Sequence, residues 1–145
     1  MNQQTMEVLG YQEILQEVGS YAITERAKKT IEIMKPSTNK KTIEHALSEV
    51  QEALEVMKIS SSIPIHTLSD MEQYINQAKK GLYIRPDQFT RIVSFLDHCH
   101  KLKRFMKDKQ YAAPNIHLYA ESIVDLSELE TEIIRCLKHG QVDDY

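Results

Sequence analysis

The stretch TIEHALSEVQEALEVM, residues 42–57, carries the strongest structural signal in the sequence. Its apolar side chains recur at i, i+3, i+4 and i+7, which is the spacing of one face of an α-helix. We therefore predict a helix after Thr38 whose other face, with Glu44, Glu49, Glu52 and Glu55, points to solvent. The apolar face is predicted to be buried and consists of Ile43, Ala46, Leu47, Val50, Ala53, Leu54 and Met57.

Capping residues, glycines and prolines delimit further helices on both sides of this stretch. Their predicted beginnings are Thr5, Thr24, Ser69, Pro86, Ile116 and Ser127, and the matching ends are Gly19, Pro36, Gly81, Lys107, Ile123 and Gly140. Alternation with period two is confined to a few residues, with Leu82-Tyr83-Ile84 left open as a strand. The prediction is an all-α fold, a helical bundle of about six helices.

Size and composition describe an ordinary globular protein. The chain has 145 residues, of which 41% are hydrophobic and 27% charged, enough for one domain over residues 1–145 with one core. Apolar runs are far shorter than the roughly 20 residues that cross a bilayer, and no apolar signal segment follows Met1. We expect a cytoplasmic protein without membrane contact.

The residue types of common catalytic and metal sites are present, but their spacing is unfavourable. His98, Cys99 and His100 are adjacent, so on a helix they diverge by about 100° each and cannot converge on one ion. We expect a buried Cys99 between solvated histidines. The serines fall mainly at predicted caps, and no phosphate-binding loop exists. The sequence predicts no catalytic residue, metal ligand or cofactor site in this chain.

A basic cluster stands out against a net charge of -3. The cluster lies within residues 101–109, where Phe105 stands between the basic residues and Asp108 is the one acid. Such a stripe can neutralise DNA phosphates, whereas the alternative is a solvated face of a core helix or a contact with the acidic residues after position 120. The DNA-contact candidates of this basic cluster are Lys101, Lys103, Arg104, Lys107 and Lys109.

The opening MEVLGYQEILQEVGSYAITERAKKTIEIMKPS, residues 6–37, resembles bacterial MutS-type proteins of the branch that lacks the mismatch-reading N-terminal domains. The SEVQEALEVM and KLKRFM stretches, the Ile63-Pro64-Ile65 connection and the closing GQVDDY resemble the same family in the same order. Arg85, where a Ser or Thr cap is usual, and Leu137, where an Asp is common, depart from it. The matching residues of the opening are Leu9, Tyr11, Ile14, Leu15, Tyr21, Ala22, Thr24, Glu25, Met34, Pro36 and Ser37.

The resemblance implies a MutS core-domain-like fold and an N-terminal piece of a larger, homodimeric DNA-binding ATPase. Such a domain connects nucleotide-driven changes with a DNA-embracing clamp, in repair or recombination control. ATP and Mg are then expected in an ATPase domain that this chain lacks, and the chain itself is not expected to be an enzyme. The alternative function is a stand-alone helical interaction module, which an apolar patch of Phe89, Phe95 and Phe105 would favour.

Mechanical coupling requires a stiff, densely packed helical unit. The residues expected to supply that core are Leu47, Val50, Leu54, Ile92, Leu96 and Ile133. Truncating Leu54 or Leu96 to Ala is predicted to cost about 2 to 5 kcal/mol of stability.

Overall fold

The computed structural model describes residues 3–65, 71–138, 141 and 142, and these residues form an all-α structure, as predicted. Residues 137–138 and 141–142 add a short antiparallel pair, β1 (Leu137–Lys138) and β2 (Gln141–Val142), which the sequence did not predict. None of the described helices is long and apolar enough to cross a membrane. The helices are α1 (Gln3–Val8), α2 (Tyr11–Ser20), α3 (Glu25–Glu32), α4 (Lys40–Ile59), α5 (Met71–Lys79), α6 (Pro86–Met106), α7 (Pro114–Glu121) and α8 (Ser127–Cys136).

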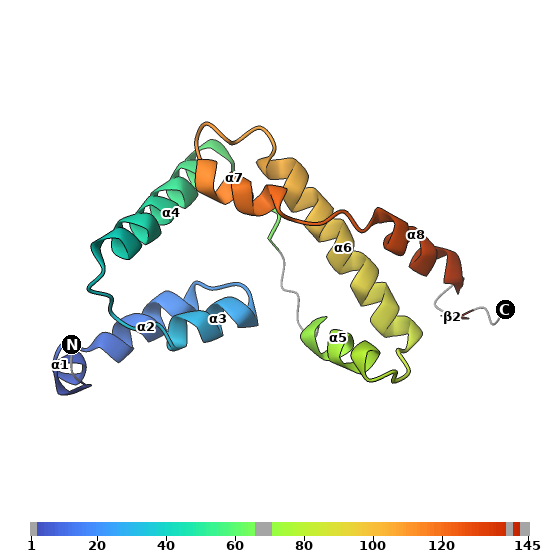
Figure 1. Ribbon diagram of the computed structural model, residues 1–145, viewed down its shortest axis with the longest axis horizontal. Helices are drawn as coiled ribbons and strands as arrows, with labels where there is room; N and C mark the ends of the chain where they lie inside the picture. The colour runs from blue at the N-terminus through green and yellow to red at the C-terminus, as the bar shows by residue number, and fades with distance from the viewer. Residues whose placement is uncertain (1–2, 66–70, 139–140, 143–145) are drawn as a thin grey trace. The chain divides into compact units, whose positions relative to one another are not determined.

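The chain divides into two compact units, residues 1–48 and 49–145. In the first, α2 packs against α3 and against α1 (Figure 1). The predicted helix from Thr5 to Gly19 is interrupted, because Gly10 adopts the left-handed conformation (φ 62°) that glycine tolerates best. Thr24 caps α3 as predicted, with its hydroxyl accepting from the Ala27 N–H at 3.2 Å.

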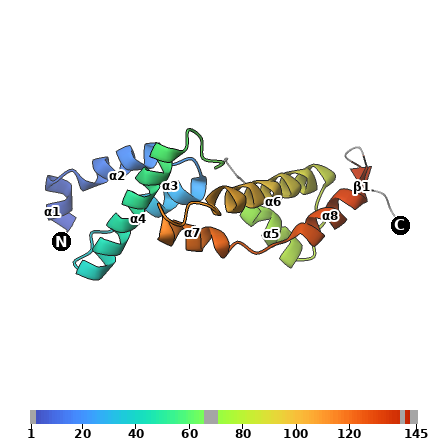
Figure 2. The ribbon, with the colours of Figure 1, turned by 90° about the horizontal axis from the view of Figure 1, so that it is seen from above.

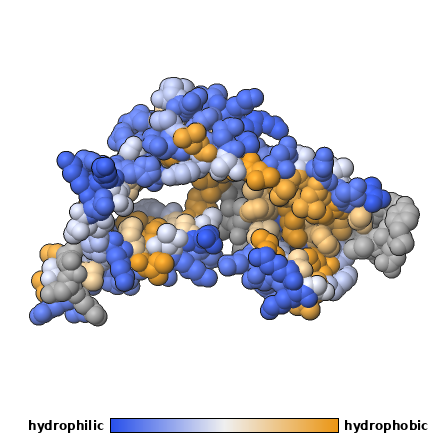
Figure 3. Space-filling view, in the orientation of Figure 1, coloured by the Kyte–Doolittle hydropathy of each residue, from blue (hydrophilic) through white to orange (hydrophobic). Residues whose placement is uncertain are grey.

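The second unit is organised around α6, which packs against both α7 and α8 (Figures 1 and 2). A cluster of buried residues, Val56, Met106, Ala113 and Ala120, joins the end of α4 to α6 and α7. Apolar side chains also gather over the face formed by α6 and α8 (Figure 3). The prediction that residues 1–145 form one domain stays a prediction.

The core prediction is correct for α6 and α8 and wrong for α4. Leu96 and Ile133 are only 6% and 9% exposed, and Ile92 is half-buried. By contrast, the three core residues predicted on α4, Leu47, Val50 and Leu54, are 63%, 58% and 47% exposed. The physical reason is that α7 packs on a different side of α4, the side that carries Glu52 and Val56.

The predicted helix ends are partly confirmed. Gly81 (φ 65°) follows α5 and Pro86 begins α6, both as expected. Helix α8 begins at Ser127 as predicted, but the Ser127 side chain does not cap it; the Asp125 carboxylate accepts from the Ser127 N–H at 2.9 Å. The predicted cap at Ser69 and the predicted end at Gly140 lie outside the described residues.

Candidate functional site

Two side chains of the basic cluster bind backbone carbonyls at helix ends. The Lys103 ammonium, which lies near the end of α6, donates to Glu121 O at 3.1 Å and to Ile123 O at 2.9 Å, at the C-terminus of α7. Lys109 donates to Phe105 O at 2.7 Å, at the end of α6. These positions carry the partial negative charge of the helix dipole, so both lysines act as C-terminal caps.

The other members of the basic cluster are exposed. Lys101 forms an ion pair with Asp97 one turn earlier on α6, at 2.6 Å. Within the described part of the chain, the side chains of Arg104 and Lys107 form no hydrogen bond or ion pair. The structure therefore divides the predicted DNA-contact residues into two structural caps and three outward-facing cations. Of the three, Arg104 and Lys107 can offer their charge to a binding partner.

The opposite end of α7 is bound by a carboxylate that the sequence analysis assigned to solvent. Glu52 of α4 is only 7% exposed, and its two oxygens accept from Asn115 Nδ2 at 2.6 Å and from the Ile116 N–H at 3.0 Å. Ala113, which precedes α7, provides no side-chain cap. Glu52 therefore supplies from another helix the anionic cap that the α7 sequence lacks.

A second carboxylate of α4 contacts the outer side of α7. The Tyr119 hydroxyl donates a hydrogen bond to Glu49 Oε1. This bond raises the pKa of Tyr119, because the neutral phenol is the donor. Helix α7 is thus held by Glu52 and Glu49 of α4 and by Lys103 of α6, and we call these three residues the α7 clamp.

A histidine links α6 to the beginning of α8. His100 lies with Nε2 3.5 Å from Asp125 Oδ1 and Nδ1 3.3 Å from Glu130 Oε2. The pKa of Asp125 is lowered, first by the Ser127 side-chain hydrogen bond and then by its backbone one. Both histidine nitrogens thus face carboxylates of one neighbouring segment, so His100 has a structural explanation that needs no metal.

The described residues contain no group of three histidine, cysteine or acidic side chains able to hold a metal ion. Cys99 is half-buried between His98 and His100, which are themselves half-buried where solvated side chains were expected. Burial raises the pKa of the Cys99 thiol. A thiol shifted in this direction is a weaker nucleophile near neutral pH, which agrees with a packing role.

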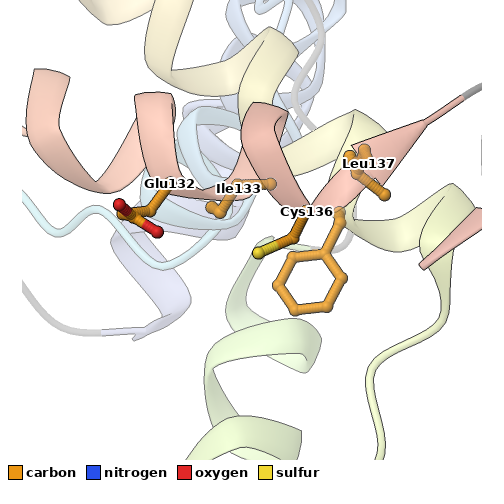
Figure 4. A pocket seen from close by; sticks show the side chains of 5 residues that line it. Glu132, Ile133, Cys136 and Leu137 are labelled. Atoms are coloured by element: carbon orange, nitrogen blue, oxygen red, sulfur yellow. The ribbon is translucent and has the colours of Figure 1, made fainter. Parts of the chain in front are cut away.

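Two apolar hollows open on the second unit. One, of about 300 Å³, is lined by Phe89 of α6 and, from α8 and the residue after it, by Glu132, Ile133, Cys136 and Leu137 (Figure 4). The other, of about 310 Å³, lies between α4, α6 and α7 and is lined almost entirely by aliphatic side chains. Neither hollow is lined by His98 or His100, so neither gathers the polar groups that an active site around them would need.

The aromatic patch expected of an interaction module is not formed by the three phenylalanines of α6. Phe89 lines the hollow beside α8, whereas Phe105 packs against the buried cluster at the other end of α6. At 1.5 Å per residue these two side chains begin about 24 Å apart along the helix. Phe95 lies between them and is half-buried.

Comparison with known proteins finds relatives that match this chain along nearly its whole length. It is 29% identical to the MutS2 endonuclease of Clostridium botulinum over 99% of the chain and 30% identical to that of Clostridium beijerinckii over 94%. It is 28% identical to that of Bacillus velezensis over the whole chain. The chain spans about a fifth of the length of these relatives (18% or 19%). No family model matches, and no solved structure matches. The resemblance to MutS-type proteins is confirmed, whereas the MutS core-like fold stays a prediction.

Proposed function

We propose that this chain, a MutS-type helical domain by its similarity to MutS2 endonucleases, couples a DNA-embracing part and an ATPase part that lie elsewhere in a longer protein. The chain itself is then a non-catalytic connector. It has no phosphate-binding loop, and ATP, Mg and the homodimer contacts are assigned to the longer protein.

The observation that carries this proposal is the α7 clamp. Glu52 binds the N-terminus of α7 and Lys103 binds its C-terminus, so one short helix connects α4 to α6 by charged hydrogen bonds at both ends. His100 continues the connection from α6 to α8. A displacement of α4 cannot leave α7 and α6 unmoved without breaking charge-assisted bonds, which are the stronger class of hydrogen bond. Such a connected set of helices suits the transmission of a domain movement.

DNA contact is assigned to the outward-facing cations of the basic cluster. Arg104 and Lys107 lie about 60° apart around the end of α6, so both can approach one phosphate backbone. Lys101 contributes less, because it is paired with Asp97. Lys103 and Lys109 stay hydrogen-bonded to backbone carbonyls, so we assign them no contact with DNA.

The coupling proposal is tested in the longer protein by Glu52→Gln, with Glu44→Gln on the exposed side of the same helix as the matched control. ATP hydrolysis is measured with and without duplex DNA. We expect the Glu52 variant to keep its basal rate and to lose DNA stimulation, while the control keeps both. Undiminished DNA stimulation in a folded Glu52→Gln protein would contradict a coupling role.

The DNA-contact proposal is tested separately with the 145-residue chain. The double variant Arg104→Glu/Lys107→Glu is compared with Lys79→Glu/Lys80→Glu, which makes the same change in net charge on exposed residues of another segment. Binding of a labelled duplex is followed by anisotropy at several salt concentrations. The logarithm of the binding constant falls as the logarithm of the salt concentration rises, and loss of two phosphate contacts should make this negative slope shallower by about 1.8. Equal changes of affinity and slope in the two double variants would refute a local contact at Arg104 and Lys107.

A further inference from the structure

A strongly exposed tyrosine follows the basic cluster, in the turn that connects α6 to α7 (Figure 1). Tyr111 is 79% exposed. Its turn is closed by two hydrogen bonds to the Lys109 carbonyl, from the Ala112 N–H at 3.0 Å and from the Ala113 N–H at 2.9 Å. Ala113 belongs to the buried cluster of the second unit, so it anchors the turn. The ring of Tyr111 is therefore presented to solvent from an anchored turn.

Tyr111 lies close in the chain to the two available cations of the basic cluster, Arg104 and Lys107. It is four residues after Lys107, and four residues of fully extended chain span at most about 14 Å. The actual separation is shorter, because the Lys109 N–H donates to the last carbonyl of α6 at 3.1 Å and bends the chain back. The one acid in between, Asp108, forms an ion pair with Lys109 at 3.1 Å, which offsets its charge. Lys107 and Tyr111 thus lie within the length of about four stacked nucleotides, at about 3.4 Å each.

The two cations suit the backbone of one nucleic-acid strand. Lys107 directly follows α6 and keeps helical backbone angles (φ -56°, ψ -39°), so it is a neighbour of Arg104 on the helix surface, with the two Cβ atoms about 5 to 6 Å apart. The other three members of the basic cluster are bound to carbonyls or to an acid. A contact of this size binds phosphates, and phosphates alone do not distinguish a duplex from a single strand.

The exposed ring distinguishes these two forms of DNA. In a duplex the bases are paired and stacked, and only their edges are presented in the grooves. An unpaired base has a free π-face, which stacks on an exposed aromatic side chain with little dependence on the identity of the base. We infer that Tyr111 stacks on an unpaired base while Arg104 and Lys107 bind the adjoining phosphates, so this surface takes single-stranded DNA. The inference rests on the DNA contact proposed above and adds the form of DNA that it recognises.

The 145-residue chain is tested by fluorescence anisotropy with two labelled probes, a short oligothymidine and a blunt-ended duplex of equal length. Tyr111→Ala should weaken binding of the oligothymidine about 5- to 150-fold and leave duplex binding unchanged, because paired bases offer no free face. Tyr111→Phe keeps the ring and should bind both probes like the unmodified chain. The matched control, Tyr83→Ala, removes another exposed tyrosine (73%), between α5 and α6, and should change neither affinity.

A second comparison separates this inference from the DNA contact on which it rests. Arg104→Glu/Lys107→Glu should weaken binding of both probes, and the salt slope should become shallower by about 1.4 for the single strand and about 1.8 for the duplex. If the unmodified chain binds neither probe, or if this double variant binds both normally, the DNA contact is refuted and the inference with it. If the double variant weakens both while Tyr111→Ala binds oligothymidine normally, the DNA contact stands and the assignment to a single strand is overturned.

Two further results would overturn the stacking role of Tyr111. Equal loss of affinity for both probes in Tyr111→Ala would mean that the ring supports the phosphate-binding surface and contacts no base. A Tyr111→Phe variant as weak as Tyr111→Ala would mean that the hydroxyl, and not the ring, contacts the DNA. Far-UV circular dichroism checks that each variant folds, which the exposure of Tyr111 leads us to expect.

Discussion

Truncating Glu52 to Ala tests the α7 clamp at its most buried charged group. The substitution leaves the partly buried Ile116 N–H without its acceptor at the start of α7; a buried donor without an acceptor costs about 1 to 3 kcal/mol. Loss of an anionic cap adds about 0.5 to 1 kcal/mol, and Asn115 loses a charged acceptor at 2.6 Å. The alanine variant no longer has to bury a charged carboxylate, and this gain in free energy offsets part of the cost. We expect the free energy of unfolding to fall by about 2 to 4 kcal/mol.

The assay is urea denaturation followed by far-UV circular dichroism, with Glu44→Ala as the control. Glu44 lies on the same helix, and its ion pair with Lys40 is long (3.7 Å) and exposed, so its removal should change stability by less than about 0.5 kcal/mol. The helix propensity gained by alanine is the same in both variants. A cost of Glu52→Ala no larger than that of Glu44→Ala would refute the conclusion that the carboxylate caps α7.

Three further predictions concern other contacts of the second unit. Leu96→Ala should cost about 2 to 5 kcal/mol, whereas Leu54→Ala should cost less than about 1 kcal/mol, measured by urea denaturation; equal costs would contradict the assigned burial. Lys103→Met should cost about 1 kcal/mol by loss of the α7 cap, while Lys107→Met should have no measurable effect in the same assay. Because the pKa of Tyr119 is raised, its contribution to stability is fully present below the ordinary tyrosine pKa of about 10 and is lost as pH rises through the folded value. In a difference titration at 295 nm against Tyr119→Phe, this tyrosine should therefore ionise late, and ionisation at the ordinary pKa would contradict the hydrogen bond.

Periodicity predicted the helices well but could not say which face of α4 is covered. The row from Ile43 to Met57 is more regular than the side with Glu52 and Val56, and a regular row is ordinarily a core face. The structure places α7 against the less regular side. Burial depends on which element arrives from elsewhere in the chain, and the repeat within one helix contains no information about that element.

The missed residue of the site, Glu52, resembles any solvated glutamate on an amphipathic helix. The sequence does carry a signal at the start of α7, the segment that Glu52 binds. Residues 112–114 read Ala-Ala-Pro, so α7 begins with proline but without a Ser, Thr, Asp or Asn to cap it. An uncapped buried helix start requires an acceptor from outside, although the sequence cannot identify which carboxylate provides it. Gly10 was a similar signal for the break between α1 and α2.

The basic cluster shows how one sequence pattern serves two purposes. Cations are expected near the C-terminus of a helix on electrostatic grounds, and Lys103 and Lys109 satisfy that expectation by binding carbonyls. Arg104 and Lys107 have the same charge and nearly the same sequence position. For Lys103, only the three-dimensional position of the end of α7, contributed by a later segment, separates this structural lysine from the cations available to a phosphate.

Amide hydrogen exchange in α7 is the most direct measurement of the central claim, that this helix is tied to α4 and α6 as one connected unit. The account predicts that the amides of α7, including Ile116, exchange as slowly as those around Leu96 in α6, and that Glu52→Ala speeds exchange throughout α7 while leaving α3 unchanged. Fast exchange of α7 in the unmodified chain, independent of the exchange of α6, would contradict the claim.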